Sequence, residues 1–507
     1  MPDSFVIRNL SIAGNYLLKT FRNSRLYIIL KRIADWFGWL LGSSILLELI
    51  KREGTLIRVW EFSGTHNFFE RILHTPTNSM RRRYEKRQHV FTCSHVYRLI
   101  ILLADNLHIL VSLALFVMVI TPHRFWYNIF TTMMVFALAI LFFIRTVIDK
   151  DTYFNLKYIN FYLAIFTMSI LLAQIFSIFP GLSLRFLVFH LNCLVLVLIL
   201  VNSISSKEQL STVLESILVG VAFVGLYGIL QYIKGVPVNP AQTDVVVNVG
   251  MPGRIYSTME NPNNLGQILL MLIPFYVAII LASSSFIKKF IIAGMGIPPL
   301  IALALTYSRS SWVGFAVTFL MFVLLTNWRY VPLFIFAGLA MIPVLPQTVY
   351  NRILTIWDPR DSSVNYRALI NKTIRPMFED YWLTGVGLGS DAFMKVVQNY
   401  PLHTKVIPPH THNLYIQIWI ETGLIGVLSF IGFLVSTVKK GIKRIRMEDD
   451  RYLKYTIIAG ISSLVGILVV GIAEYVWYYP RVMVIFWVVA GLLLAALNLT
   501  GSKENIT

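Results

Sequence analysis

The segment Pro409-His410-Thr411-His412-Asn413 joins a long polar stretch to an apolar run that begins at Leu414. The polar stretch, residues 347–413, interrupts an otherwise almost continuous series of apolar runs. A chain built of apolar runs has little reason to keep one long ordered loop unless that loop carries a function. The junction at Leu414 is therefore the point from which we interpret the rest of the chain.

The composition indicates a polytopic helical membrane protein. The 507 residues are 56% hydrophobic, and the mean hydropathy of +0.67 is far above that of a soluble domain. The N-terminus does not resemble a cleavable signal peptide, because Lys19, Arg22 and Arg25 break its first apolar run. The two cysteines, Cys93 and Cys193, form no disulfide or metal framework.

Runs of roughly 17–25 apolar residues are long enough to cross a bilayer as helices. The expected fold class is an all-α integral membrane protein with about twelve transmembrane helices and a large extracytoplasmic helical loop between spans 9 and 10. Residues 99–507 then form one polytopic domain, and residues 347–413 are its large outer loop. We expect the spans at about residues 99–121, 126–148, 158–178, 183–201, 211–233, 264–283, 289–306, 310–326, 330–346, 414–437, 454–474 and 481–498.

The formal net charge of +19 does not indicate a nucleic-acid partner, because the basic residues gather on one predicted side of the membrane. About 30 of the 44 Lys and Arg fall there, sixteen of them before the first span and seven in the link 438–454. This bias marks the cytoplasmic side of a multi-pass protein in the cytoplasmic (inner) membrane. The links 234–263 and 307–309 and the large outer loop then face outward.

Residues 1–98 are predicted to form a basic N-terminal segment in the cytoplasm or at the membrane interface. The run at residues 33–50 contains Asp35 and Glu48 and several aromatic residues, which favours an interfacial helix over a span. The Lys and Arg between residues 51 and 98 are expected to lie against anionic headgroups of the lipid bilayer.

Two outward links contain an arginine close to a span. In the first, Arg254 is followed by Asn261-Pro262-Asn263, and these asparagines can cap the next helix. The link is either a capped polar loop or part of an anion site, since a guanidinium matches a phosphate and a helix N-terminus presents free N–H groups. In the second link, Arg309 either extends to the outer surface or supports the site.

The large outer loop contains an amphipathic pattern followed by a glycine-rich stretch. The pattern predicts a helix over residues 365–382, with Arg367 among its basic residues. The stretch at residues 383–389 lacks the Lys-Ser/Thr pair of a nucleotide-binding loop, and ATP is scarce outside the cell. We therefore predict a tight turn that requires positive φ.

His410 and His412 close the loop and are one residue apart. They lack a third ligand and the i,i+4 spacing of a helical zinc site, so no metal is expected. An imidazole with an ordinary pKa of about 6.5 suits general-base chemistry at neutral pH. Asp149-Lys150-Asp151 matches the DxD of metal-dependent sugar-nucleotide transferases, but only over three residues of a short cytoplasmic link. Glu474, near a span end, is compatible with a structural role.

Taken together, these segments resemble the O-antigen ligase family, which shares its core with O-antigen polymerases and bacterial protein O-oligosaccharyltransferases. His412-Asn413, nine residues and then Gly423-Leu424-Ile425-Gly426 is similar to the family's His-Asn…Gly-x-x-Gly signature. Two further segments are similar to landmarks of the family. One is Arg254 followed by Asn261-Pro262-Asn263, and the other is Arg367 followed by Pro376 and Gly385-Val386-Gly387. The likeness covers roughly residues 158–498, and the segment 1–98 departs from the family pattern.

The resemblance implies a metal-independent, inverting glycosyltransferase that needs no cofactor. It implies transfer of a glycan from a polyprenyl-diphosphate-linked donor to a hydroxyl group of a glycan or glycolipid acceptor, on the extracytoplasmic face. By the same resemblance, Arg254 and Arg367 hold the donor diphosphate, and His412 acts on the acceptor. The expected substrate-binding residues are Arg309, His410, Asn413, Asn261 and Asn263. His410 either orients the acceptor or hydrogen-bonds the loop.

The motifs do not separate a ligase, which joins a polysaccharide to an acceptor, from an O-antigen or teichuronic-type polymerase, which lengthens it. A polysaccharide transporter or flippase is the alternative from another class, and a channel or receptor is a third. A transporter is expected to show paired half-sequences or charges at the membrane midplane. The charged candidates of this chain gather in outer links, which favours an enzyme.

Overall fold

The structure, a computed structural model, describes residues 28, 29, 31, 32, 35, 64–92, 94–150, 152, 160–240, 243, 250–355 and 362–501. These residues form helices and loops, and no strand occurs among them, which confirms the predicted all-α class. Nine helices of this part of the chain are long and apolar enough to cross a membrane, or up to ten with one bent pair. The count of about twelve spans stays a prediction.

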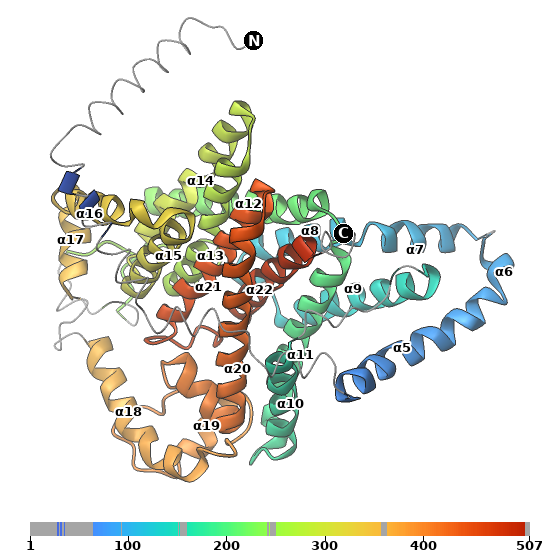
Figure 1. Cartoon of the computed structure of the whole chain (residues 1–507). Helices are drawn as coiled ribbons and strands as arrows, with labels where there is room; N and C mark the ends of the chain where they lie inside the picture. Colours follow the sequence, from blue (N-terminus) through green and yellow to red (C-terminus); the bar gives the residue numbers. More distant parts are fainter. Residues whose placement is uncertain are drawn as a thin grey trace, which may run out of the picture. The chain divides into compact units, whose positions relative to one another are not determined.

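Figure 1 labels most of the helices. Eight helices of span length are α9 (Asn128–Ile148), α11 (Pro180–Ser203), α12 (Lys207–Lys234), α13 (Pro262–Ala282), α14 (Phe286–Leu305), α20 (Leu414–Met447), α21 (Arg451–Val470) and α22 (Pro480–Gly501). The ninth candidate, Arg309–Val344, comprises α15 (Arg309–Asn327), η2 (Trp328–Tyr330), α16 (Val331–Met341) and η3 (Ile342–Val344). The remaining helices are α5 (Gly64–Glu85), α6 (Gln88–Thr92), α7 (His95–Asp105), α8 (Leu107–Ile120), η1 (His123–Phe125), α10 (Phe161–Ile175), α17 (Gln347–Leu354), α18 (Ser362–Tyr381) and α19 (Gly389–Val397).

The chain divides into two compact units. The smaller unit comprises residues 1–53 and 320–346, and its described part contains the end of α15 together with η2, α16 and η3. The larger unit comprises residues 54–319 and 347–507 and contains every residue of the candidate functional site. Within it, α13 packs against α21, α22 against α11, and α10 against α20. α22 and α13 are the most completely buried of the candidate spans, so their apolar side chains face other helices.

Two predicted spans differ from the structure for local reasons. The run 99–121 is two helices, α7 and α8, bent by 72°. Asn106 lies at the bend with non-helical angles (φ −101°, ψ 30°), and its side-chain amide donates to the carbonyl oxygen of Leu102 at 2.9 Å. The run 454–474 leaves its helix at Val470, so Glu474 belongs to a loop of residues 471–479 between α21 and α22.

The remaining differences concern residues 310–346 and 33–50. The spans expected at residues 310–326 and 330–346 fall in the one candidate segment Arg309–Val344. The interfacial helix expected at residues 33–50 lies outside the described residues, apart from Asp35.

The large outer loop is ordered because it has a core of its own. The predicted helix at residues 365–382 is confirmed as α18, with bounds Ser362–Tyr381. Ile370, Ile374 and Met377 of this helix are buried together with Phe393 of α19 and Ile420 of α20. The loop is thereby anchored to the first part of α20.

A break in α20 receives the glycine-rich stretch of the loop. Gly423 has left-handed φ (71°, with ψ −176°), and the carbonyl groups of Ile420 and Glu421 accept hydrogen bonds from the backbone N–H groups of Val386 (2.8 Å) and Gly387 (3.3 Å). Every glycine between residues 383 and 389 has positive φ, at 75°, 110° and 84°. The predicted tight turn is therefore confirmed, and its partner is the broken helix.

Candidate functional site

Separate segments of the larger unit bring charged side chains together. We call the following six residues the charged cluster: Arg254 from the link before α13, Arg309 at the start of α15, Arg352 on α17, Arg367 on α18, His412 before α20, and Glu474 in the loop 471–479. Direct contacts join Arg367, Glu474 and His412. Electrostatic interactions join Arg254 to Arg352, Glu474 and Arg309. Residues that the sequence predicted on three distant outward segments thus lie in one place.

Glu474 connects Arg367 to His412. Its Oε1 accepts a hydrogen bond from Nη2 of Arg367 at 2.6 Å, and its Oε2 lies 3.4 Å from Nδ1 of His412. Burial alone would raise the pKa of this carboxyl group, but Arg367 and His412 outweigh burial and lower the pKa of Glu474 from 4.5 to about 2. Glu474 is therefore ionised at neutral pH.

The ionised carboxylate sets the tautomer of His412. Because Glu474 can only accept, this contact favours the neutral tautomer of His412 that carries its proton on Nδ1 and its lone pair on Nε2. The imidazole also packs edge-on against Tyr366, with 5.8 Å between ring centroids. About a quarter of the His412 side chain, 23%, is exposed. His412 is thus held from two sides and still accessible as a proton acceptor.

His410 packs against His412 and is buried. The two ring centroids are 4.2 Å apart, and the backbone N–H of His412 donates to Nδ1 of His410 at 3.2 Å. Burial is the main cause that lowers the pKa of His410 to about 3, so this imidazole is neutral. His410 therefore makes a hydrogen bond within the loop, one of its two expected roles. Its contact with an acceptor stays a prediction.

Arg254 is a buried guanidinium, only 7% exposed. Its Nε donates to the carbonyl oxygen of Thr306 at 2.8 Å, and its Nη2 donates to Oδ1 of Asn263 at 2.6 Å. Burial and the like charge of Arg352 lower the pKa of Arg254 to about 9, which leaves it cationic at neutral pH. A buried cation next to another cation is stabilised by an added anion, so this environment favours a phosphate group.

Arg352 is a second buried guanidinium, 6% exposed, and its Nε lies 3.4 Å from the carbonyl oxygen of Tyr307, to which it donates. Arg309 binds just beyond α17, where its Nη1 donates to the carbonyl oxygen and to Oγ1 of Thr355, the latter at 3.1 Å. Oγ1 of Thr355 in turn donates to the carbonyl oxygen of Arg352 at 2.9 Å. This arrangement favours the supporting role of Arg309 over its extension to the outer surface.

Backbone strain is concentrated around the charged cluster. Among the described residues, the non-glycine residues with positive φ are Ser257 (51°), Tyr307 (49°) and His412 (52°). Each belongs to a segment that supplies a member of the cluster. Left-handed backbone costs such residues roughly 1–3 kcal/mol and persists where surrounding contacts enforce it, as at many active sites and ligand clamps.

The predicted asparagines position these segments. Asn261 and Asn413 cap α13 and α20, because each side-chain oxygen accepts backbone N–H groups of the first turn at 2.9–3.1 Å. Nδ2 of Asn413 also donates to the carbonyl oxygen of Ile472 at 2.9 Å and so ties α20 to the loop 471–479. Asn263 bonds Arg254, as described above. Direct contact of these asparagines with a substrate stays a prediction.

Sequence reasoning did not select Arg352 or Glu474 for the site. Arg352 stands in the large outer loop directly before Ile353-Leu354 and two residues after Tyr350, and such apolar neighbours are a sign of burial that could have marked it. Glu474 precedes Tyr475-Val476-Trp477-Tyr478-Tyr479, and an acidic residue beside such an apolar stretch needs a partner. Which partner it has could not be read from the sequence.

The charged cluster can bind an anion and remove a proton at neighbouring positions. Arg254 and Arg352 supply buried positive charge, and Nε2 of His412 supplies a base whose orientation depends on Glu474. Among the residues that the structure describes, no group of three or more His, Cys, Asp or Glu side chains is placed to hold a metal ion. The arrangement suits a reaction in which an anion leaves while a hydroxyl group attacks.

Comparison with known proteins supports the resemblance to the O-antigen ligase family. A search among curated proteins finds no significant match. A family model described as "O-Antigen ligase" matches residues 294–431, which extend from within α14 into α20 and contain four members of the charged cluster, while Arg254 and Glu474 lie outside. The resemblance of this chain to the O-antigen ligase family, whose members are membrane glycosyltransferases of the ligase and polymerase type, is thereby confirmed over residues 294–431.

Proposed function

We propose that the charged cluster transfers a glycan from a polyprenyl-diphosphate-linked donor to a hydroxyl group of a glycan or glycolipid acceptor, at the extracytoplasmic face of the cytoplasmic membrane. The observation that carries the proposal is the contact between His412 and ionised Glu474, in one cluster with the buried guanidinium groups of Arg254 and Arg352. The family match supports the general class of reaction.

On the donor side, Arg254 and Arg352 hold the diphosphate, whereas Arg367, the second arginine expected to hold it, pairs with Glu474. When the bond between the anomeric carbon and the phosphate oxygen breaks, its electron pair goes to the oxygen and the leaving diphosphate gains negative charge. Guanidinium groups fixed in a buried site stabilise that charge without reorganising. Removing one such group is expected to cost on the order of 3 kcal/mol in the barrier. Arg367 adds positive charge and keeps Glu474 ionised.

On the acceptor side, the hydroxyl group donates to Nε2 of His412. Its proton passes to the imidazole as its oxygen attacks the anomeric carbon opposite the diphosphate, so the anomeric centre is inverted. Glu474 stabilises the imidazolium that forms. The diphosphate linkage of the donor supplies the driving force, and the mechanism therefore requires neither a nucleotide nor a metal ion.

The test is an assay of the purified protein in lipid nanodiscs with an undecaprenyl-diphosphate-linked oligosaccharide and a glycolipid acceptor. We expect His412→Ala to lower the release of polyprenyl diphosphate by about 10²–10⁴-fold. The matched control is His403→Ala, because His403 is an exposed histidine of the same loop.

If folded His412→Ala released polyprenyl diphosphate at the wild-type rate, His412 would not be the base. A protein that moves the lipid-linked glycan across the bilayer but releases no polyprenyl diphosphate would be a transporter, and the transferase proposal would fall.

A further inference from the structure

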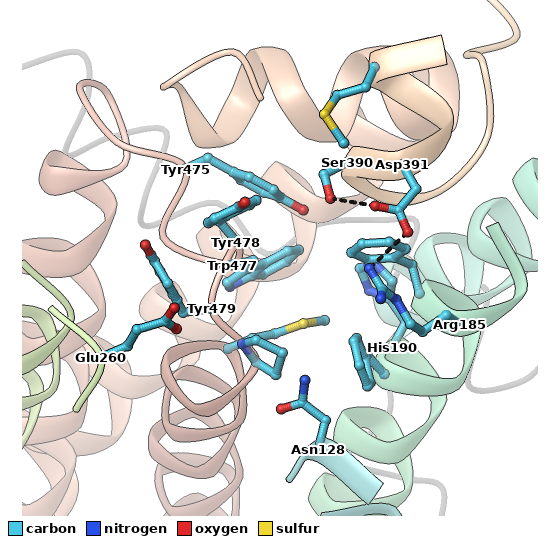
Figure 2. A pocket seen from close by; sticks show the side chains of 15 residues that line it. Asn128, Arg185, His190, Glu260, Ser390, Asp391, Tyr475, Trp477, Tyr478 and Tyr479 are labelled. Atoms are coloured by element: carbon cyan, nitrogen blue, oxygen red, sulfur yellow. Dashed lines mark hydrogen bonds and ion pairs between the residues drawn. The ribbon is translucent and has the colours of Figure 1, made fainter. Parts of the chain in front are cut away.

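A cavity of about 230 Å³ lies beside the charged cluster, and the mechanism above does not use it. Figure 2 shows side chains of the loop 471–479 across its centre, with Glu260 on one side and Asp391 and Arg185 on the other. We call it the aromatic cavity, because six aromatic residues line it: Phe186, Phe189, Tyr475, Trp477, Tyr478 and Tyr479.

The lining of the aromatic cavity matches the chemistry of a sugar ring. The C–H faces of a pyranose are apolar and pack on flat aromatic rings, while its hydroxyl groups donate hydrogen bonds to carboxylates. Glu260 and Asp391 supply such carboxylates on opposite walls (Figure 2). Asp391 is held in place by Arg185, at 2.8 Å between Oδ2 and Nη2, and by Oγ of Ser390 at 3.5 Å. Rings with a few fixed polar groups are typical of small-molecule sites.

Charge separates the aromatic cavity from the charged cluster. The cavity is lined by two carboxylates and one guanidinium, and that guanidinium already pairs with Asp391. Among the residues that the structure describes, the cluster instead contains four arginines and one carboxylate. An anionic diphosphate is therefore favoured at the cluster, and a neutral ligand rich in hydroxyl groups is favoured in the cavity.

Tyr478 connects the two places. Its ring lines the cavity and lies 4.4 Å from the ring of His410, which in turn lies 4.2 Å from the ring of His412. Tyr479 packs edge-on against Tyr478 at 5.0 Å. The cavity is thus connected to His412 through the rings of Tyr478 and His410, and neither histidine lines it. Its volume of about 230 Å³ is below the roughly 300–1,000 Å³ of pockets for drug-sized ligands, which suits one monosaccharide unit.

We infer that the aromatic cavity binds a neutral sugar unit of the acceptor glycan and thereby holds the acceptor beside the charged cluster, where a neighbouring unit of the acceptor brings the attacking hydroxyl group to His412. This inference rests on the proposed transferase function for the identity of the ligand as acceptor. It adds that Glu260, Asp391 and the aromatic residues of the loop 471–479 determine which acceptor is used. The donor is held separately, through its diphosphate, by the arginines.

The inference is tested by saturation-transfer NMR on the purified protein in nanodiscs, without turnover. The probes are the methyl glycosides of glucose, galactose and N-acetylglucosamine. The binding of inorganic diphosphate, which has no C–H protons for this experiment, is measured in a separate titration. At least one glycoside should bind the wild-type protein, and Glu260→Gln and Tyr479→Ala should each weaken that binding about tenfold or more. Glu379→Gln, an exposed carboxylate on α18 with 64% of its side chain accessible, is the matched control and should bind as wild type.

The two ligands should respond to different variants. Arg254→Lys should weaken the binding of diphosphate and leave that of the glycoside unchanged, whereas Glu260→Gln should do the reverse. No glycoside binding to the wild type, binding that survives both cavity variants, or displacement of the glycoside by diphosphate would each overturn the inference. Glycoside binding that depends on Glu260 in a protein without transferase activity would keep the sugar site and refute only the proposed reaction.

Discussion

Replacing Glu474 by Gln keeps the size of the side chain and removes its charge. In the wild-type protein, the carboxylate accepts a hydrogen bond from Arg367 at 2.6 Å and orients Nδ1 of His412 at 3.4 Å. The neutral amide of the glutamine cannot balance the positive charge of Arg367. Its NH₂ group can donate to Nδ1 of His412, which would place the imidazole proton on Nε2. Glu474→Gln should therefore reduce both the stability of the protein and its activity.

The loss of stability follows from the pKa of Glu474. Because burial is outweighed by Arg367 and His412, this pKa is lowered from 4.5 to about 2, which corresponds to roughly 3 kcal/mol at neutral pH. A carboxylate whose pKa is lower in the folded protein stabilises it fully above pH 4.5, and the contribution disappears as the pH falls toward 2. The difference between wild type and Glu474→Gln should thus be constant from pH 7 to about pH 5 and shrink below it.

The loss of activity follows from the tautomer of His412. General-base catalysis contributes about 10²–10⁴ in rate, and it requires an unprotonated Nε2. The contact of 3.4 Å is long for a hydrogen bond, so we expect a loss near the lower end, about 10²-fold in kcat.

Thermal unfolding in detergent between pH 7 and pH 3 measures the first effect, and release of polyprenyl diphosphate measures the second. Glu379→Gln, which is largely exposed on α18, is the control for both. A Glu474→Gln protein with wild-type turnover would show that Glu474 does not orient the base. A stability difference that grows below pH 4.5 would show that the carboxylate is not the stabilising form.

Three further predictions concern the anion site, the helix break and metal. Arg254→Lys should lower the rate of polyprenyl diphosphate release about 10²-fold, because a point charge replaces a two-pronged donor. Arg375→Lys, on the exposed face of α18, is the control and should keep the wild-type rate. A wild-type rate in Arg254→Lys would exclude bidentate binding of phosphate. Gly423→Ala should destabilise the protein by more than about 2 kcal/mol, because the added Cβ would lie 2.1 Å from the carbonyl oxygen of Leu383. Gly294→Ala is the control, because the added Cβ would meet open space. If both variants unfolded at the wild-type temperature, the break in α20 would be dispensable. Chelator should leave turnover unchanged, and activity lost to chelator and restored by a divalent ion would contradict a metal-free mechanism.

Local sequence properties were sufficient for much of the fold. Hydropathy predicted the helical class and the positions of most long helices, the amphipathic pattern predicted α18, and the glycines predicted the turn at residues 383–389. Hydropathy did not predict where a helix bends or ends if the residues around that point are still apolar on average. The bend at Asn106 is flanked by apolar runs, and Gly471-Ile472-Ala473 continues the apolar character of α21 although the helix has ended.

The amino-acid sequence by itself identified Arg254, Arg367 and His412 as candidates, because each stands in a motif that resembles one of the O-antigen ligase family. Only the tertiary structure decided which groups act on one another. Glu474 is 107 residues from Arg367 and 62 residues from His412, yet it contacts both. Tyr478 likewise contacts His410 and lines a cavity that no sequence motif predicted. The reason is that hydropathy depends on neighbours in the chain, whereas the energy between charges depends on their distance in space and on burial, which arise only when the helices pack.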